Sequence, residues 1–265
     1  MILEKIPNNI SVIIVTYNRL NYLKLTVESV LAQSIRFKEL LIVCDGHQED
    51  VKDYISSLND ERILYHYVNH CGYPAKGRNL GLQLAKGDYI AFCDDDDLWM
   101  PQKLRKQMAV FQNDPSVGLC FARRSIIDSN GDAVEGTTVK WIPRKPTVHN
   151  LLLTNYISYS SVVINKAVLQ KTGIYMDDIR FKAVEDYHLW LRIALLSKIY
   201  FIDEVLMLYR VHNSNISDKQ LSDGAKKNML LYKDLFSKFK FSYPDKLKAR
   251  LTVYSKFLTY KLLGK

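Results

Sequence analysis

One stretch of the sequence joins an apolar run to four consecutive carboxylates: Gly87-Asp88-Tyr89-Ile90-Ala91-Phe92-Cys93-Asp94-Asp95-Asp96-Asp97-Leu98-Trp99-Met100-Pro101. Adjacent like charges repel one another, so we expect a cation to offset them. Hard divalent metals take oxygen ligands, often one or two carboxylates with substrate phosphates and water. The run follows a β-like segment, and open α/β sheets place ligands beyond the carboxyl ends of strands. The stretch therefore predicts a Mg²⁺ or Mn²⁺ site that binds a nucleotide diphosphate; a solvated acidic turn is the alternative.

Strand-like and helix-like patterns alternate around this stretch, along the first 130 residues. Apolar or β-branched runs predict strands over residues 10–15, 40–44, 62–68, 89–93 and 117–127, and helical spacing predicts helices over 20–33, 51–58, 75–85 and 101–112. Strands that alternate with helices imply βαβ units. The predicted fold class is α/β, with a Rossmann-like, mainly parallel central sheet and helices on both faces.

The composition is that of an ordinary globular protein, with 265 residues, of which 48% are hydrophobic and 25% charged. Residues 1–9 lack the basic-then-apolar pattern of a signal peptide, and no window is long and apolar enough for a membrane span. The four cysteines are spaced too widely for a zinc ribbon or a disulfide framework. We therefore expect a cytoplasmic protein with reduced cysteines. The sequence indicates no oligomeric state.

The net charge of +9 is concentrated at the end of the chain, because residues 221–265 contain eleven Lys or Arg and three Asp. The remaining residues are nearly neutral, which argues against a nucleic-acid-binding core. Apolar residues in this tail recur at helical spacing and predict two basic amphipathic helices with a break near Tyr243-Pro244. Such helices can bind an anionic membrane surface, or they can pack on the rest of the protein and leave their lysines solvated.

Potential ligand groups follow the predicted strands. Thr16-Tyr17-Asn18-Arg19 follows the first strand and Asp45-Gly46 the second, so both should meet the acidic run at one edge of the sheet. Tyr17 can stack on a base, Asp45 can accept a hydrogen bond from a base N–H, and Arg78 can pair with phosphate. The alternatives are ordinary turn chemistry and a solvated arginine.

Six motifs, in this order, resemble those of the family 2 glycosyltransferases: SVIIVTYNR (11–19), VCDG (43–46), AKGRNLG (75–81), GDYIAFCDDDDLWMP (87–101), EDYHLWLR (185–192) and YRVH (209–212). The resemblance covers about residues 10–215. It implies a GT-A fold as a catalytic domain over residues 1–220, with a nucleotide-sugar-binding half at about 1–128 and an acceptor-binding half at 129–220. The basic helical tail over 221–265 would follow it.

On the donor side, the resemblance assigns Thr16, Tyr17 and Asp45 to the nucleobase and Arg78 to the donor nucleotide. The chain departs from the family pattern at Cys44, where the family often has the first Asp of an Asp-Asp pair. This departure removes no charged contact that the resemblance requires.

Four contiguous Asp leave the register of the Asp-X-Asp motif ambiguous. The distance from Asp96 to Pro101 matches the family spacing and favours Asp94-Asp95-Asp96. In this register Asp94 and Asp95 bind the donor, with Asp95 toward the ribose, and Asp96 is the principal metal ligand. Asp97 is the less favoured ligand.

The resemblance also identifies Asp186 as the catalytic base, which would remove a proton from the acceptor hydroxyl as it attacks C1 of the sugar. Glu185 would orient the acceptor or Asp186. His188 and Trp99 are predicted acceptor contacts, with Trp190 as an equal candidate, because aromatic faces suit sugar rings. Without the other motifs, Glu185 and Asp186 would be two exposed acids favoured by a helix dipole.

Arg210 and His212 follow a strand-like run over residues 201–209. The resemblance places this Arg-X-His near the donor diphosphate, with Arg210 as a donor contact and His212 as a metal ligand. The alternative for His212 is a structural histidine.

The sequence thus predicts a metal-dependent inverting glycosyltransferase, of the hexosyltransferase type, that uses a nucleotide-sugar donor, with UDP favoured. The acceptor would be a hydroxyl of a glycan, lipid-linked or free, in bacterial surface polysaccharide synthesis such as O-antigen or capsule. The protein would work in the cytoplasm, either free or attached as a peripheral protein to the inner face of the membrane. A sugar-phosphate nucleotidyltransferase is one alternative, although residues 15–19 contain no glycine for its phosphate loop. A non-catalytic lipid- or nucleic-acid-binding module is another.

Overall fold

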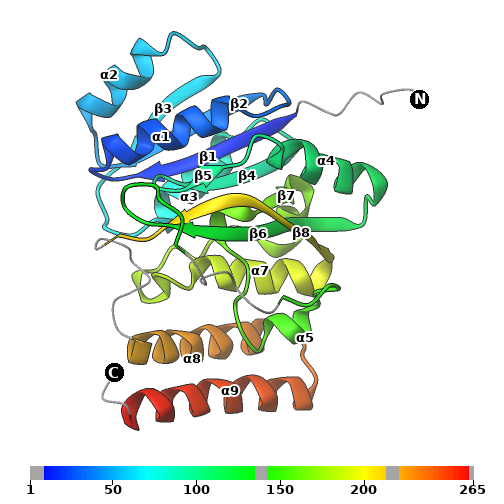
Figure 1. The fold of residues 1–265 in the computed structure, drawn as a ribbon. Coiled ribbons are helices and arrows are strands. Elements are labelled where there is room, and N and C mark those ends of the chain that lie inside the picture. Colours follow the sequence, from blue (N-terminus) through cyan, green and yellow to red (C-terminus); the bar gives the residue numbers. More distant parts are fainter. Residues whose placement is uncertain (1–8, 135–141, 213–220, 263–265) are drawn as a thin grey trace.

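The computed structural model describes residues 9–134, 142–212 and 221–262, and within them an eight-stranded mixed sheet forms the centre (Figure 1). The strands are β1 (Ile10–Thr16), β2 (Glu39–Asp45), β3 (Ile63–Val68), β4 (Tyr89–Asp94), β5 (Leu98–Trp99), β6 (Val117–Ile127), β7 (Val163–Asn165) and β8 (Lys198–Arg210). The helices are α1 (Leu20–Leu31), α2 (Glu49–Ser57), α3 (Ala75–Leu84), α4 (Lys103–Asn113), α5 (Val148–Leu151), α6 (Leu169–Thr172), α7 (Glu185–Leu196), α8 (Leu221–Lys238) and α9 (Tyr243–Leu262). Three short 3₁₀ turns lie at Tyr159–Ser161, Lys166–Val168 and Ile179–Phe181.

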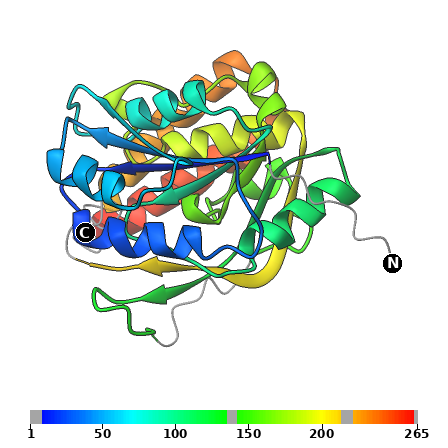
Figure 2. The same ribbon diagram turned by 90° about the horizontal axis from the view of Figure 1, so that it is seen from above.

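The strand order is β3-β2-β1-β4-β7-β6-β8-β5, and Figure 2 shows β3 and the β6–β8 pair on opposite sides of the molecule. The first four strands of this order are parallel, and β7 is antiparallel to both β4 and β6. Because β8 is parallel to β6, the carboxyl ends of β1, β2, β4, β6 and β8 all lie at one edge. The prediction of a mainly parallel α/β sheet is confirmed, with β5 and β7 as short antiparallel additions.

Two apolar cores lie on opposite faces of the sheet, because side chains alternate along each strand. Ile10, Val12 and Ile14 of β1 pack with α1, α2 and α4, whereas Ile13 packs with α3, α7 and α8. Helix α3 lies so close to the sheet that a Cβ on Gly81 would be 2.6 Å from the Ile13 side chain. This close approach requires glycine. Nearer the start of α3, a Cβ on Gly77 would be 2.9 Å from the Val15 side chain, which places this end of the helix against the carboxyl edge.

The two tail helices form successive layers below α7, with α9 outermost (Figure 1). Leu231, Tyr232 and Leu235 of α8 are buried, and the Tyr232 hydroxyl lies 2.9 Å from that of Tyr187 on α7. The break between the helices lies where the sequence predicts it. Helix α8 is therefore part of the core. No helix among the described residues is both long enough and apolar enough to cross a lipid bilayer.

Candidate active site

A cavity of about 660 Å³ opens at the carboxyl edge of the sheet. The ends of β1, β2 and β4, the first turn of α7 and the segment 155–159 all contribute to its walls. It brings together nine of the predicted site residues: Thr16, Tyr17, Asp45, Arg78, Asp94, Asp95, Asp96, Glu185 and Asp186. The convergence of strand ends that the sequence predicts is thus present in the fold.

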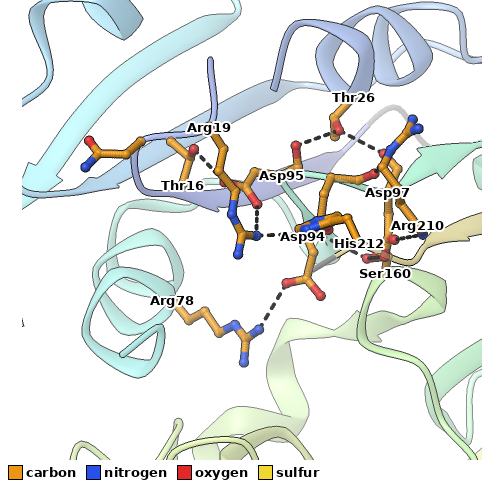
Figure 3. Close-up of polar contacts among 12 residues, drawn as sticks. Thr16, Arg19, Thr26, Arg78, Asp94, Asp95, Asp97, Ser160, Arg210 and His212 are labelled. Atoms are coloured by element: carbon orange, nitrogen blue, oxygen red, sulfur yellow. Dashed lines mark hydrogen bonds and ion pairs between the residues drawn. The ribbon is translucent and has the colours of Figure 1, made fainter. Parts of the chain in front are cut away.

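Asp95 and Asp96 share one counter-ion, Arg19, whose Nη1 lies 3.1 Å from Asp95 and 2.9 Å from Asp96 (Figure 3). Asp95 also accepts a hydrogen bond from the Thr16 hydroxyl at 2.6 Å. Burial and the charge of Asp96 raise the pKa of Asp95 to about 7, and burial and the charge of Asp94 raise the pKa of Asp96 to about 6. One guanidinium therefore does not offset the whole acidic run. Sequence reasoning gave Arg19 no role, although it ends the first motif.

Asp97 also lines the cavity and connects the acidic run to β8. It accepts hydrogen bonds from the backbone N–H of Arg210, at 3.0 Å, and from the Ser160 hydroxyl. The Thr26 hydroxyl of α1 donates to the backbone carbonyls of Asp95 and Asp97. These contacts fix the shape of the turn and give Asp97 a structural position.

His212 Nε2 lies 2.9 Å from Asp96 Oδ2, whereas the Asp94 carboxylate is 36% exposed at the cavity. No group of three or more potential metal-binding side chains converges within the described parts of the chain. Mg²⁺ and Mn²⁺ need no such cage, because they are often held by one or two protein groups with phosphate and water. The cluster of carboxylates at the end of β4 and the Asp96–His212 pair fit a hard divalent cation.

Arg210 is almost fully buried and does not line the cavity. Its Nε donates to the backbone carbonyl of Asp96 at 2.9 Å, and its Nη1 donates to the carbonyls of Asp128 and Ser129. Arg210, which the sequence predicts as a donor contact, thus stabilises the backbone of the acidic turn instead of facing the cavity. A buried guanidinium can satisfy several carbonyls at once because it has five N–H donors.

Arg78 bridges the acidic run and α7. Its Nη1 lies 2.6 Å from Glu185, its Nη2 lies 3.1 Å from Asp94, and its guanidinium carbon lies 3.7 Å from the centre of the Tyr159 ring. The sequence assigns Arg78 to the donor nucleotide, which stays a prediction. In the structure Arg78 lines the cavity, and its two terminal nitrogens pair with Asp94 and Glu185.

Asp186 is the second residue of α7 and is half-buried in the cavity wall. Its Oδ1 accepts a hydrogen bond from the N–H of Tyr187 at 2.6 Å. Burial and the adjacent Glu185 carboxylate raise the pKa of Asp186 to about 7. Ala183, which lines the same wall, has a φ of 73°, a conformation unfavourable for alanine. A strained turn next to a carboxylate of near-neutral pKa is typical of a catalytic base.

The far end of the cavity has an aromatic surface. The Tyr17 and His70 rings stack with their centres 4.4 Å apart, and Asp45 accepts hydrogen bonds from the backbone N–H groups of Cys71 and Gly72. Sequence reasoning missed His70, which follows β3 in no recognisable motif. An aromatic face beside a carboxylate suits a nucleobase with an N–H donor.

Two predicted acceptor contacts lie outside the cavity, which corrects that prediction. The Trp99 indole is buried, and its N–H donates to the carbonyl of Ser160 at 2.9 Å. His188 is 1% exposed and pairs through Nε2 with Asp234 of α8. Trp190, the other candidate, is fully buried. All three side chains are packed in the protein interior, and none lines the cavity.

The chain is similar to known proteins along most of its length. The family model for glycosyl transferase family 2 matches residues 11–171. A Bacillus subtilis (strain 168) glycosyltransferase, TuaG, whose name provisionally assigns it to teichuronic acid biosynthesis, is 33% identical over 85% of this chain and 88% of its own. The Escherichia coli UDP-Glc:α-D-GlcNAc-diphosphoundecaprenol β-1,3-glucosyltransferase WfaP is 27% identical over 84% of this chain and 85% of its own.

The fold is likewise similar to solved structures. The crystal structure of Staphylococcus aureus TarS 1–349 in complex with UDP-GlcNAc has a TM-score of 0.75 to this chain, with 17% sequence identity. The similarity covers 95% of this chain and 73% of that one. It shows a shared GT-A fold.

Proposed function

Because the chain belongs to glycosyl transferase family 2, we propose that it is a metal-dependent, inverting enzyme that moves a sugar from a nucleotide diphosphate to a hydroxyl of a glycan. One observation supports this most strongly: the acidic run and Asp186 line the same cavity, and Arg78 bridges Asp94 of the run to Glu185, the neighbour of Asp186. An inverting transferase needs a site for the leaving diphosphate opposite a base, and this cavity provides both kinds of group.

The chain's own residues account for the proton and for the orientation of the base. Asp186, deprotonated, accepts the proton of the acceptor hydroxyl as its oxygen bonds to C1 of the sugar and the bond from C1 to the diphosphate oxygen breaks. Arg78 and Glu185 hold the first turn of α7 against the acidic run. A divalent cation held by Asp96 and His212 would offset the charge on the leaving diphosphate.

We favour a uridine nucleotide as the donor, because the Tyr17–His70 stack and the Asp45 carboxylate can bind a flat base with an N–H group. The bound UDP-GlcNAc in TarS and the UDP-Glc in the name of WfaP are consistent with this choice. The names of TuaG and WfaP also support an acceptor in surface polysaccharide synthesis, carried in the case of WfaP on a lipid diphosphate.

The function is tested by nucleotide binding and turnover with Mn²⁺ or Mg²⁺. UDP, dTDP and GDP are titrated into the purified protein, and UDP-sugars are then assayed for transfer and slow hydrolysis. Saturable, metal-dependent binding of UDP supports the proposal. Binding of UTP together with a sugar 1-phosphate, with release of pyrophosphate, would identify a nucleotidyltransferase, and no nucleotide binding at all would favour a non-catalytic module.

The turnover rate should rise with pH through about 7, because Asp186 must be deprotonated to act as a base and its pKa is raised to about 7. One pH unit below this pKa the rate should be about tenfold lower, and above it the rate should level off. The measurement is kcat at saturating donor and metal between about pH 5 and pH 9. A flat profile would exclude Asp186 as the titrating base.

We also propose that α9 contacts the inner face of an anionic membrane, where a lipid-linked acceptor would be found. Tyr243, Leu247, Leu251 and Tyr254 are exposed at helical spacing on its outer side, while Ala249 and Val253 face inward. Lys248 and Arg250 are exposed along the same helix. An apolar stripe with basic neighbours is complementary to anionic headgroups.

Reversing the charges of Lys248 and Arg250 to glutamate should weaken binding to phosphatidylglycerol vesicles at least about tenfold, because each basic residue near such a surface contributes about 1 kcal/mol. Vesicle sedimentation at low and high salt measures the effect. Leu25→Ser, which changes an exposed apolar residue of α1 on the other side of the sheet, is the control. Equal binding by the charge-reversed and original proteins would favour the alternative, in which the basic residues of the tail are simply solvated.

A further inference from the structure

The arginines that line the cavity differ in their partners. Arg19 pairs with Asp95 and Asp96, and Arg78 pairs with Asp94 and Glu185. Arg124 of β6 has no carboxylate partner within the described residues. Its Nη1 donates to the Ser158 hydroxyl at 3.0 Å, and its Nε, like that of Arg78, is buried without a hydrogen-bond partner there. A guanidinium that lines the cavity with only a neutral hydroxyl as its hydrogen-bond partner can bind an anion there.

The packing of Arg124 fixes the plane of its guanidinium. The Tyr209 ring of β8 lies beneath it, with 4.5 Å between the guanidinium carbon and the ring centre. Stacking on a ring leaves the N–H groups at the edge of the plane available. The preceding residue, Arg123, pairs instead with Asp203 and does not line the cavity, because neighbouring side chains on a strand point to opposite faces.

Arg124 belongs to the wall that supports the proposed base. Ser158, its partner, precedes Tyr159, which stacks on Arg78, and Arg78 in turn holds Glu185 beside Asp186. Within the described residues, the contacts of Arg124 are with Ser158 and Tyr209 and not with the aromatic surface of Tyr17 and His70. These contacts connect Arg124 to the wall that carries Glu185 and Asp186 and, because Arg78 also pairs with Asp94, to the edge of the acidic run.

We propose that Arg124 binds an oxyanion of the acceptor, a phosphate or a carboxylate close to the hydroxyl that receives the sugar. This inference rests on the proposed function. A guanidinium presents two parallel N–H donors that match the oxygens of either anion, and a charged hydrogen bond in a partly buried site is stronger than a neutral one. The donor diphosphate would be bound elsewhere, through the cation proposed at the acidic run.

The test compares Arg124→Gln with Arg123→Gln, which makes the same change at the adjacent position outside the cavity. The proteins are first saturated with UDP and Mg²⁺, and inorganic phosphate is then titrated by calorimetry. The original protein and Arg123→Gln should bind phosphate alike, and Arg124→Gln should bind it about tenfold more weakly. The affinity for UDP should be the same in all three proteins.

A second set of titrations identifies the anion. Glucose 1-phosphate, glucuronic acid and glucose differ in carrying a phosphate, a carboxylate or no charge, and the preferred anion should lose its advantage over glucose only in Arg124→Gln. Arg124→Lys, which keeps the charge but not the fork, should bind phosphate with intermediate affinity and serves if the glutamine variant does not fold.

Three results would overturn the inference. They are no phosphate binding to the UDP-saturated original protein, equal phosphate binding by it and Arg124→Gln, or a loss of UDP affinity in Arg124→Gln, which would assign Arg124 to the donor diphosphate. Failure of the proposed function is a separate result, because it appears as the absence of UDP binding before any phosphate is added.

Discussion

Replacing Asp96 with asparagine should lower the rate of sugar transfer about 10³-fold or more, because the leaving diphosphate loses the cation that offsets its charge. The Asp96 carboxylate lies at the cavity, 2.9 Å from His212, and burial and the charge of Asp94 raise its pKa to about 6. A carboxylate held among like charges is poised to bind a metal. Transfer with Mn²⁺ or Mg²⁺, together with Mn²⁺ binding in the presence of UDP, measures the effect.

Asp97→Asn is the matched control for this prediction, since it removes one charge from the next position. Asp97 accepts hydrogen bonds from Arg210 and Ser160, which an asparagine amide can largely reproduce. We expect this variant to retain metal binding and most of the activity. If both variants lose metal binding equally, or if transfer continues in EDTA, the register of the acidic motif or the need for a metal is wrong.

The sheet and the meeting of its strand ends could be predicted because they depend on local patterns. β-Branched runs such as residues 10–15 specify buried strands, and βαβ connections then bring Thr16, Asp45 and Asp94 to one edge. The short strands β5 and β7 were not predicted, because two or three residues show no periodicity. Their pairing depends on neighbours far away in the chain.

The partners of individual side chains were harder to predict. Arg78 and Glu185 are separated by 107 residues, so no sequence pattern shows that they pair. Trp99 and His188 are residue types that suit either a core or a sugar site, and only the packing shows that both face inward. Arg124 carries no motif and is distinguished from Arg123 only by the face of β6 from which it projects.

The Arg78 bridge also explains why the pKa of Asp186 is not raised further. Glu185 and burial favour the neutral carboxyl, and the nearby guanidinium of Arg78 opposes them. The result is a pKa of about 7, at which a base is partly deprotonated and still able to take a proton. Arg78 thus influences the proposed base while it holds Asp94 at the acidic run.

Replacing Asp186 with asparagine should lower kcat by roughly 10²-fold or more, because an amide cannot accept the proton of the acceptor hydroxyl. The change is isosteric, and the amide oxygen can still accept the hydrogen bond from Tyr187 that Asp186 accepts at 2.6 Å. The fold and the affinities for UDP and metal should therefore be unchanged, so that the loss appears in kcat alone. The rise of rate with pH through about 7 should also disappear from whatever activity remains.

Glu185→Gln distinguishes the base from its neighbour. This variant weakens the pairing with Arg78, whose Nη1 lies 2.6 Å from Glu185, but leaves the Asp186 carboxylate in place. Because one like charge beside Asp186 is removed, the pKa of Asp186 should fall, and the pH profile of kcat should move to lower pH rather than vanish. If Asp186→Asn transferred sugar at the original rate while Glu185→Gln lost it together with the pH dependence, Glu185 would be the base and Asp186 its support.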